Sequence, residues 1–331
     1  MIEILHRMSL VTLAATLGLG AGPAVKPGTL HVAILMEGRN AQHQPQVNGL
    51  RDGLEELKYV EGKNLSWQRI DGETRKELGD NLKSWLPRHR VDVMVTLGTT
   101  ETQVARAIAP KFPMVFLPAA DPVKSGFVHS LASPKTNLTG LAFFTDSANL
   151  GKQLEVFKQV IPSLGRVWVL FDGRLKTSAF SESWHKFVAV AAWLGIHVIE
   201  LPVASSAEAS RKIAALPDPS GSDGVFVFCS GFFKDVGEIA AAATKRKLPL
   251  FGCTAFQVAE QKVLLSYAPD LYSLGYRGAW FVDRIFKGAK PRDLPVEAPR
   301  KFELVINHKV AGEIGLKISP GMLMLADRVF R

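Results

Sequence analysis

The sequence has few of the residues on which metal sites and disulfide scaffolds depend. It has two cysteines in 331 residues, Cys229 and Cys253, with no Cys-x-x-Cys and no paired histidines at ligand spacing. A metal site and a disulfide-rich scaffold are therefore not expected. An oxidising compartment would permit a bridge between the two cysteines, but bridging depends on Cβ geometry that a sequence does not reveal. We expect two free, partly buried thiols.

The motifs of common catalytic sites are also missing. The chain has no Gly-x-x-x-x-Gly-Lys-[Ser/Thr] phosphate loop and no Gly-x-Ser-x-Gly elbow. None of its eight histidines falls in the strand-end loops described below, so no base is placed beside a nucleophile. We expect no cofactor and no enzymatic activity. An exported two-domain α/β enzyme stays open as an alternative, and it would need a catalytic constellation in a cleft.

Long apolar runs are absent except near the start of the chain. There an apolar run from Met8 to Leu19 follows two basic residues and precedes small ones. The run is shorter than the ~20 residues of a membrane span. This layout is typical of a secretory signal peptide, which we assign to residues 1–24. Cleavage after Ala21 or Gly22 is also open. No cysteine follows the run for lipid attachment, so we expect a soluble periplasmic protein.

The excess of basic residues does not form a nucleic-acid site. Lysine and arginine number 40 against 31 acidic residues, an excess of nine. The basic residues are spread along the chain, with no dense tract interleaved with aromatics. We interpret the excess as a solvated basic surface and expect no nucleic-acid partner.

What the chain does have is an internal duplication. Residues 30–120 and 165–255 both run strand, helix, strand, helix, strand, helix, strand. The predicted strands are 30–36, 64–70, 91–98 and 112–120 in the first stretch, and 166–172, 196–203, 223–230 and 248–255 in the second. They are dense in Val, Ile, Leu and Phe, as in parallel sheets buried on both faces. The sequence predicts an α/β fold of two doubly wound parallel-sheet lobes. The cleft between two such lobes is a natural site for a small ligand.

The chain is expected to cross between the lobes more than once. We place a first crossing at residues 141–144 and a second after residues 263–270, with the helix over 271–286 returning to the first lobe. Lobe one is then 25–142 plus 268–290, and lobe two is 143–267 plus 291–331. A terminal helix, capped by Ser319, is expected over the last dozen residues.

Ligands of open α/β sheets meet the carboxyl ends of the strands, so the candidate site is read from those loops. The candidate ligand-binding residues there are Glu37, Gly38, Gly98, Thr99, Thr100, Ala120, Asp121, Asp172, Ser230, Thr254 and Tyr267. The segment from Gly98 to Thr100 is the best of these, because a helix starts there. Its free N–H groups and two hydroxyls can hold a carboxylate. Equally, Thr99 or Thr100 can simply cap the helix.

Carboxylates and aromatic rings near the same edges suggest the rest of the ligand. Asp121, Glu37 or Asp172 can meet an amine, although Asp121 can equally cap a helix and exposed loop carboxylates are usually only solvated. Aromatic side chains gather near the strand ends and the first crossing: Phe143, Phe144, Phe171, Phe232, Phe233, Phe251 and Tyr267. Most should be core, but two facing the cleft would suit an apolar or aromatic ligand. Asp121→Asn is predicted to weaken an amine-bearing ligand.

Several segments resemble one family closely. They are "GLRDGLEELKYVEGKNL" (49–65), "AADPVKSGFVHSLASPKTNLTGL" (119–141), the block over 264–307 that opens "LLSYAPDLYSLGYRG", and "GLKISPGMLMLAD" (315–327). The family is that of ABC-transporter periplasmic substrate-binding proteins, including tryptophan/tyrosine-type binders. The resemblance implies a type I periplasmic-binding fold with a hinge of three crossings. It also implies delivery of a ligand to an ABC permease in the inner membrane, without catalysis.

The resemblance carries over to particular positions. The family's Gly-Thr-x turn matches Gly98, Thr99 and Thr100, its Asp-Pro-Val matches residues 121–123, and its Asn-x-Thr-Gly adds Thr139 and Gly140 as candidates. The chain departs from the family at residues 172–174 and at Cys229. We expect a monomer that binds an aromatic or branched amino acid, or else a small carboxylate or heterocycle. A ligand-sensing module for a membrane receptor stays open, and neighbouring genes would distinguish it.

Overall fold

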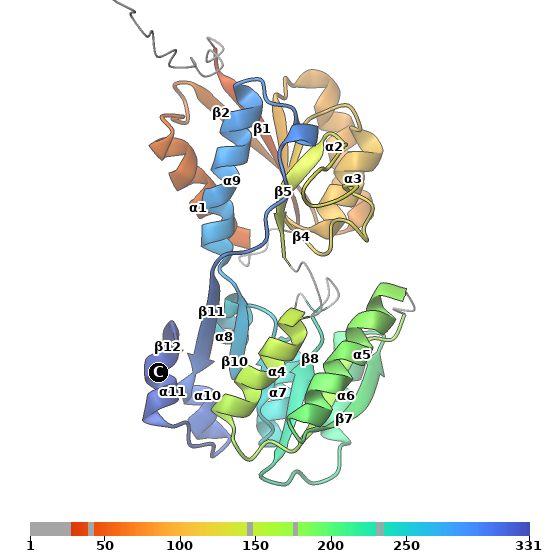
Figure 1. Cartoon of the computed structure of the whole chain (residues 1–331), viewed down its shortest axis with the longest axis vertical. Helices are drawn as coiled ribbons and strands as arrows, with labels where there is room; N and C mark the ends of the chain where they lie inside the picture. The colour runs from red at the N-terminus through yellow and green to blue at the C-terminus, as the bar shows by residue number, and fades with distance from the viewer. Residues whose placement is uncertain (1–27, 39–42, 144–147, 175–177, 230–232, 234) are drawn as a thin grey trace, which may run out of the picture.

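The structure is a computed structural model that describes residues 28–38, 43–143, 148–174, 178–229, 233 and 235–331. It has two lobes, each a β-sheet with helices on both faces (Figure 1). In the described residues, one sheet has five parallel strands in the order β2-β1-β3-β4-β5. The other has seven in the order β12-β11-β10-β9-β8-β6-β7, with β10 and β11 antiparallel. The predicted two-lobe α/β fold is confirmed.

Lobe one contains the first duplicated stretch and one helix from late in the chain. Its elements are β1 (Leu30–Glu37), α1 (Gln44–Glu56), β2 (Leu65–Gly72), α2 (Arg75–Trp85), β3 (Val93–Thr96), α3 (Thr99–Ile108), β4 (Met114–Ala119), β5 (Leu138–Ala142) and α9 (Leu271–Phe286). Every residue of β3, β4 and β5 is buried, as the unbroken apolar runs predict for central parallel strands. Each helix between strands buries one apolar stripe. Because all five strands are parallel, their carboxyl ends share one edge.

Lobe two repeats this order and adds an antiparallel extension. Its elements are α4 (Ala148–Val160), β6 (Arg166–Asp172), α5 (Ser178–Trp193), β7 (His197–Val203), α6 (Ser206–Ala214), β8 (Asp223–Val227), α7 (Gly237–Lys245), β9 (Leu250–Gly252), α8 (Ala255–Glu260), β10 (Leu265–Pro269), β11 (Phe302–Asn307), α10 (His308–Glu313), α11 (Pro320–Leu325) and β12 (Arg328–Phe330).

The end of the chain differs from the prediction of one terminal helix. Ser319 caps α11 as expected, but the helix ends at Leu325 and residues 328–330 form an edge strand beside β11. Asp327 accounts for the change, because its N–H donates to Leu304 O and its carboxylate accepts from Leu304 N–H. These two hydrogen bonds hold the backbone extended.

The third crossing also comes later than predicted. Residues 291–297 still belong to lobe one, where Leu294 and Val296 lie in its hydrophobic core. Glu297 pairs with the end of β5, donating to Gly140 O and accepting from Ala142 N–H. The chain therefore leaves lobe one after Glu297 and not at residue 291, because β5 offers a free edge for the segment to pair with.

Helices α1 and α9, far apart in sequence, lie side by side in Figure 1 and pack closely. Glycines permit this approach, since a Cβ at Gly49 would overlap Tyr272 O and one at Gly275 would overlap Gln46 O. At the far end of the pair, the Tyr59 hydroxyl donates to Asp283 Oδ1 at 2.9 Å. The packing places the first turn of α1 against the N-terminal part of α9, with Gln46 O facing Gly275. None of the helices in the described ranges has the length and apolarity to cross a bilayer.

Candidate ligand-binding cleft

A cavity of about 190 Å³ lies between the lobes, at the edge where the strands end. Its lining is His43, Gln46, Leu97, Gly98, Thr99, Thr100, Glu101, Pro118, Ala120 and Phe143 from lobe one, Cys229, Phe233, Cys253, Thr254 and Gln257 from lobe two, and Leu271 at the start of α9. Both walls combine apolar groups with a few fixed polar ones, as small-molecule sites do.

Five of the predicted site residues line this cavity: Gly98, Thr99, Thr100, Ala120 and Thr254. The N-cap of α3 is Gly98, so Thr99 and Thr100 are its first helical residues and do not cap it. The Thr99 hydroxyl instead accepts a hydrogen bond from Ala120 N–H at 2.9 Å. Thr254 does cap its helix, because its hydroxyl accepts from Gln257 N–H.

Two predicted carboxylates lie outside the cavity lining and are bound within their own loops. Asp121 Oδ1 accepts from Lys124 N–H at 3.0 Å, and its other oxygen is 3.5 Å from Lys124 Nζ. Asp172 receives both guanidinium hydrogen bonds of Arg174, at 2.8 and 2.9 Å. The hydrogen bonds from Arg174 lower the pKa of Asp172 and keep it ionised.

The other predicted residues support the fold near the cleft without lining the cavity. The Thr139 hydroxyl donates to Leu294 O, and Gly140 packs directly on the backbone of Phe116. The Tyr267 ring stacks on Phe302 with centroids 5.5 Å apart. Glu37 and Gly38 lie at the end of β1, outside the lining, with Gly38 N–H bonded to Gly72 O. Ser230 falls outside the described residues.

The structure brings in four polar residues that the sequence reading missed: His43, Gln46, Glu101 and Gln257. Gln46, on the first turn of α1, donates to Leu117 O at 3.1 Å, and its carbonyl lies 3.1 Å from His43 Nδ1. His43 precedes α1 and Gln46 lies in its first turn. Because α1 packs on α9 and neither residue follows a strand, a search of the loops at strand ends does not find them.

Glu101 is a carboxylate in the first turn of α3 and is only 2% exposed. Its Oε1 accepts from Glu37 N–H at 3.0 Å, and its other oxygen lies against Gly98, where a Cβ would overlap it. Gly98, at φ +141°, thus gives the carboxylate its room. Glu101 is the one Asp, Glu, Lys or Arg among the described lining residues. The sequence signal that could have identified Glu101 is its position in the first turn of the helix that was predicted to start at residues 98–100.

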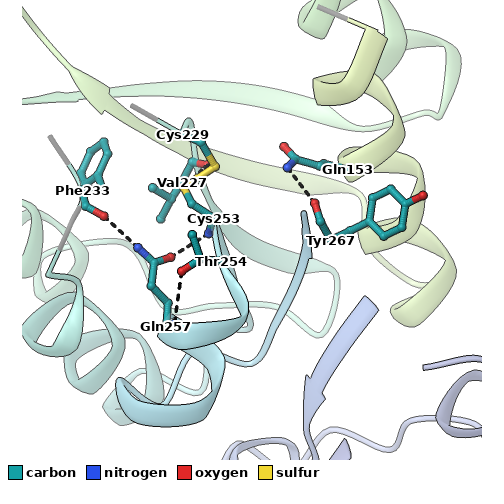
Figure 2. The surroundings of a disulfide bond; sticks show 8 residues. All are labelled: Gln153, Val227, Cys229, Phe233, Cys253, Thr254, Gln257 and Tyr267. Atoms are coloured by element: carbon teal, nitrogen blue, oxygen red, sulfur yellow. Dashed lines mark hydrogen bonds between the residues drawn. A yellow bond between two sulfur atoms is a disulfide. The ribbon is translucent and has the colours of Figure 1, made fainter. Parts of the chain in front are cut away.

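The expectation of free thiols is wrong, because Cys229 and Cys253 form a disulfide with Cα atoms 5.4 Å apart (Figure 2). The strands before them are neighbours in the sheet, with Phe226 paired to Phe251. Adjacent strand ends bring the two Cα atoms into the range that a disulfide spans. Both cysteines line the cavity, so the disulfide is part of the cleft wall.

The aromatic residues divide between core and cleft. Phe143 and Phe233 line the cavity, whereas Phe171 and Phe251 belong to the hydrophobic core of lobe two. Phe144 and Phe232 fall outside the described residues. Within the described chain no group of His, Cys, Asp and Glu could hold a metal ion.

Comparisons with known proteins agree with this architecture. A family model described as "ABC transporter substrate binding protein" matches residues 31–330. A tyrosine-binding protein of Clostridioides difficile (strain R20291) is 22% identical over 261 residues, which are 78% of this chain and 73% of the relative. A conserved domain protein of Vibrio cholerae has a TM-score of 0.79 at 24% identity, covering 91% of this chain and 99% of that one.

An ABC domain in complex with L-Trp from Streptococcus pneumonia also has a TM-score of 0.79, at 21% identity, covering 92% of this chain and all of that one (100%). These two structures share the fold of this chain, the type I periplasmic-binding fold of two lobes. Because the family model spans nearly the whole described chain, the protein belongs to the ABC transporter substrate binding protein family, a family of binding proteins and not of enzymes.

Proposed function

We propose that this protein is the periplasmic solute-binding component of an ABC importer and that it binds a small organic ligand between its lobes. The observation that carries the proposal is the cavity itself, which is lined by strand-end loops of both lobes in a chain of this family. A ligand that touches both walls favours the closed arrangement of the lobes, because it binds that state better than the open one.

The proposed ligand is an aromatic or branched amino acid, with tyrosine and tryptophan the first candidates. Phe143 and Phe233 provide rings for an apolar side chain. The Thr99 and Thr100 hydroxyls, at the start of α3, provide polar contacts. The tyrosine-binding relative and the L-Trp complex of the similar fold support the same class.

Delivery of the ligand requires a membrane partner that recognises how the two lobes are arranged. We propose that the chain is exported by its N-terminal apolar segment and works as a monomer. It docks on an inner-membrane permease through surfaces of both lobes. Because closure changes how the two surfaces sit relative to each other, docking depends on whether the cleft is occupied.

Thermal-shift screening of metabolites tests the proposal. A ligand at about 100 times its Kd adds about 2.7 kcal/mol to the free energy of unfolding and raises the Tm. We expect L-tyrosine or L-tryptophan to raise it, and small-angle scattering to show a smaller radius of gyration with ligand. The matched variant is Thr100→Val, which keeps the shape of the wall but removes a hydroxyl. It should reduce the rise in Tm that the ligand causes. No stabilising metabolite, or recovery of the ligand chemically altered, would contradict the proposal.

A further inference from the structure

The disulfide lies where a hydrophobic core of lobe two meets the wall of the cleft, because Cys253 belongs to that core, Cys229 packs against it, and both line the cavity. Its two cysteines follow β8 and β9, whose pairing is already made by the parallel ladder of Val225 with Leu250 and Phe226 with Phe251. The sheet therefore does not depend on the sulfur bridge for its register. What the bridge fixes is the distance between the two strand-end loops at Cys229 and Cys253, which are both residues of the cavity lining.

The same loops are held by one side-chain amide, shown in Figure 2. Gln257 Oε1 accepts from Cys253 N–H at 2.7 Å, and Gln257 Nε2 donates to Phe233 O at 2.8 Å. Gln257 itself is buried and lies on α8, which Thr254 caps. Phe233, Cys253, Thr254 and Gln257 all line the cavity. The disulfide adds Cys229 to this set, so one connected unit forms the wall of lobe two.

Lobe one has a weaker tie at the matching place. There the loops after its third and fourth strands are joined by the hydrogen bond from Ala120 N–H to Thr99 Oγ1, and both residues line the cavity. Each lobe therefore links the same two strand ends where they face the cavity, once by a hydrogen bond and once by a covalent bond. A shared position in both halves points to a role in shaping the cleft.

We propose that the Cys229–Cys253 disulfide is a positioning element of the ligand site, which holds Phe233, Thr254 and Gln257 in their binding geometry. The proposal rests on the proposed function of the cleft. Reduction of the disulfide should then weaken ligand binding while leaving the fold of lobe two in place. Without the bond, part of the binding free energy must be spent on ordering these residues, whereas the oxidised wall is already ordered.

Two ways of breaking the bond make the test. One is the double variant Cys229→Ser with Cys253→Ser. The other is dithiothreitol on the unmodified chain, in which the two thiols of the reagent become its cyclic disulfide and the protein gains two cysteine thiols. Dithiothreitol added to the double variant is the matched control and should change nothing.

The first readout is hydrogen exchange, which needs no ligand. We expect the rate of amide exchange to rise about tenfold in residues 253–257, including the Cys253 N–H that donates a hydrogen bond to Gln257 Oε1. Strands β6 and β8 should stay as protected from exchange as before. Exchange that rises across all the strands of lobe two would overturn the proposal, because the bond would then stabilise the whole lobe. Unchanged exchange in residues 253–257 would overturn it too.

The second readout is the Kd for L-tyrosine and L-tryptophan by calorimetry, which we expect to rise about tenfold on either way of breaking the bond. An unchanged Kd would overturn the proposal while leaving the binding function intact. If the oxidised chain binds neither amino acid, the proposed ligand class fails, and the exchange measurement alone decides the role of the disulfide.

Discussion

Among single residues, Glu101 stands out as the Asp, Glu, Lys or Arg side chain of the described cavity lining. The start of α3 was predicted to hold a ligand carboxylate through its N–H groups and hydroxyls. The structure places a carboxylate of the protein there, in the first turn of the same helix, where the helix dipole stabilises it. A second carboxylate from the ligand would meet like charge at this end of the wall. A ligand amine would meet opposite charge.

Glu101→Gln therefore should weaken an amine-bearing ligand more than Asp121→Asn does. Glutamine keeps the size of the side chain and an oxygen for the Glu37 N–H, but it removes the charge. A buried charge pair with one partner neutralised loses about 2 kcal/mol or more, so we expect the Kd of tyramine or L-tyrosine to rise about 30-fold, measured by calorimetry.

The comparison with Asp121→Asn separates the two candidate carboxylates. Asp121 is held by Lys124 outside the cavity lining, so its substitution should change the Kd by less than about threefold. A larger loss of affinity in Asp121→Asn than in Glu101→Gln would restore Asp121 as the amine partner. Circular dichroism of both variants checks that the fold is intact.

At this scale the sequence predicted the part of the site that follows from one rule. Parallel strands end at a common edge, and that rule correctly brought Thr99, Thr100 and Thr254 to the cavity. It could not find Gln46, which reaches the cleft because α1 packs on a helix more than 200 residues later. Nor could it show that Asp172 is bound by Arg174, because the direction of a loop side chain depends on its neighbours.

Among the elements, α1 and α9 pack so closely that a side chain larger than that of glycine would not fit at Gly49. Gly49→Ala should destabilise the protein, because the new Cβ would overlap Tyr272 O and the helices cannot approach as closely. Overpacking of this kind usually costs about 1–3 kcal/mol. Urea unfolding followed by circular dichroism measures the change in the free energy of unfolding.

Gly312→Ala in α10 is the matched control, since a Cβ there meets nothing within 4 Å. The same substitution in an open helix should be neutral or raise stability by up to about 1 kcal/mol, because alanine is the better helix former. Equal effects of the two substitutions would mean that the close approach of α1 and α9 contributes nothing to stability.

The boundaries of the elements show why prediction from sequence stopped where it did. Apolar periodicity located the strands and helices of both halves, because each must bury its face against the same sheet. The strand at residues 328–330 was missed because it exists only as a partner of β11, and the exit at Glu297 was missed because it depends on the edge of β5. Pairing with distant segments leaves no local pattern.

At the scale of the whole molecule, an ion pair of lobe one lies where the chain begins its last crossing to lobe two. Arg277, on α9, makes two hydrogen bonds to Glu297 at 3.0 and 2.6 Å. Glu297 is where the last crossing leaves lobe one. A second pair, Lys124 with Glu182 at 3.2 Å, links the two lobes directly but is well exposed on both sides. Exposed pairs contribute little, so the pair of Arg277 with Glu297 should contribute more to stability.

The ion pair of Arg277 with Glu297 should make the stability of the fold depend on pH. Hydrogen bonds from Arg277 are the main cause of a lowered pKa for Glu297 in the folded chain, acting against its partial burial. A carboxyl with a lowered folded-state pKa stabilises the fold above its unfolded value of about 4.3, and that contribution is lost as the pH falls through the folded-state value. Glu297→Gln should therefore lower the free energy of unfolding by about 1 kcal/mol at pH 7 and by much less near pH 3. Urea unfolding of both chains across this range measures the difference, with Glu182→Gln as the exposed control expected to show little at either pH. A deficit in Glu297→Gln that persists unchanged at pH 3 would show that the pair acts through packing and not through charge.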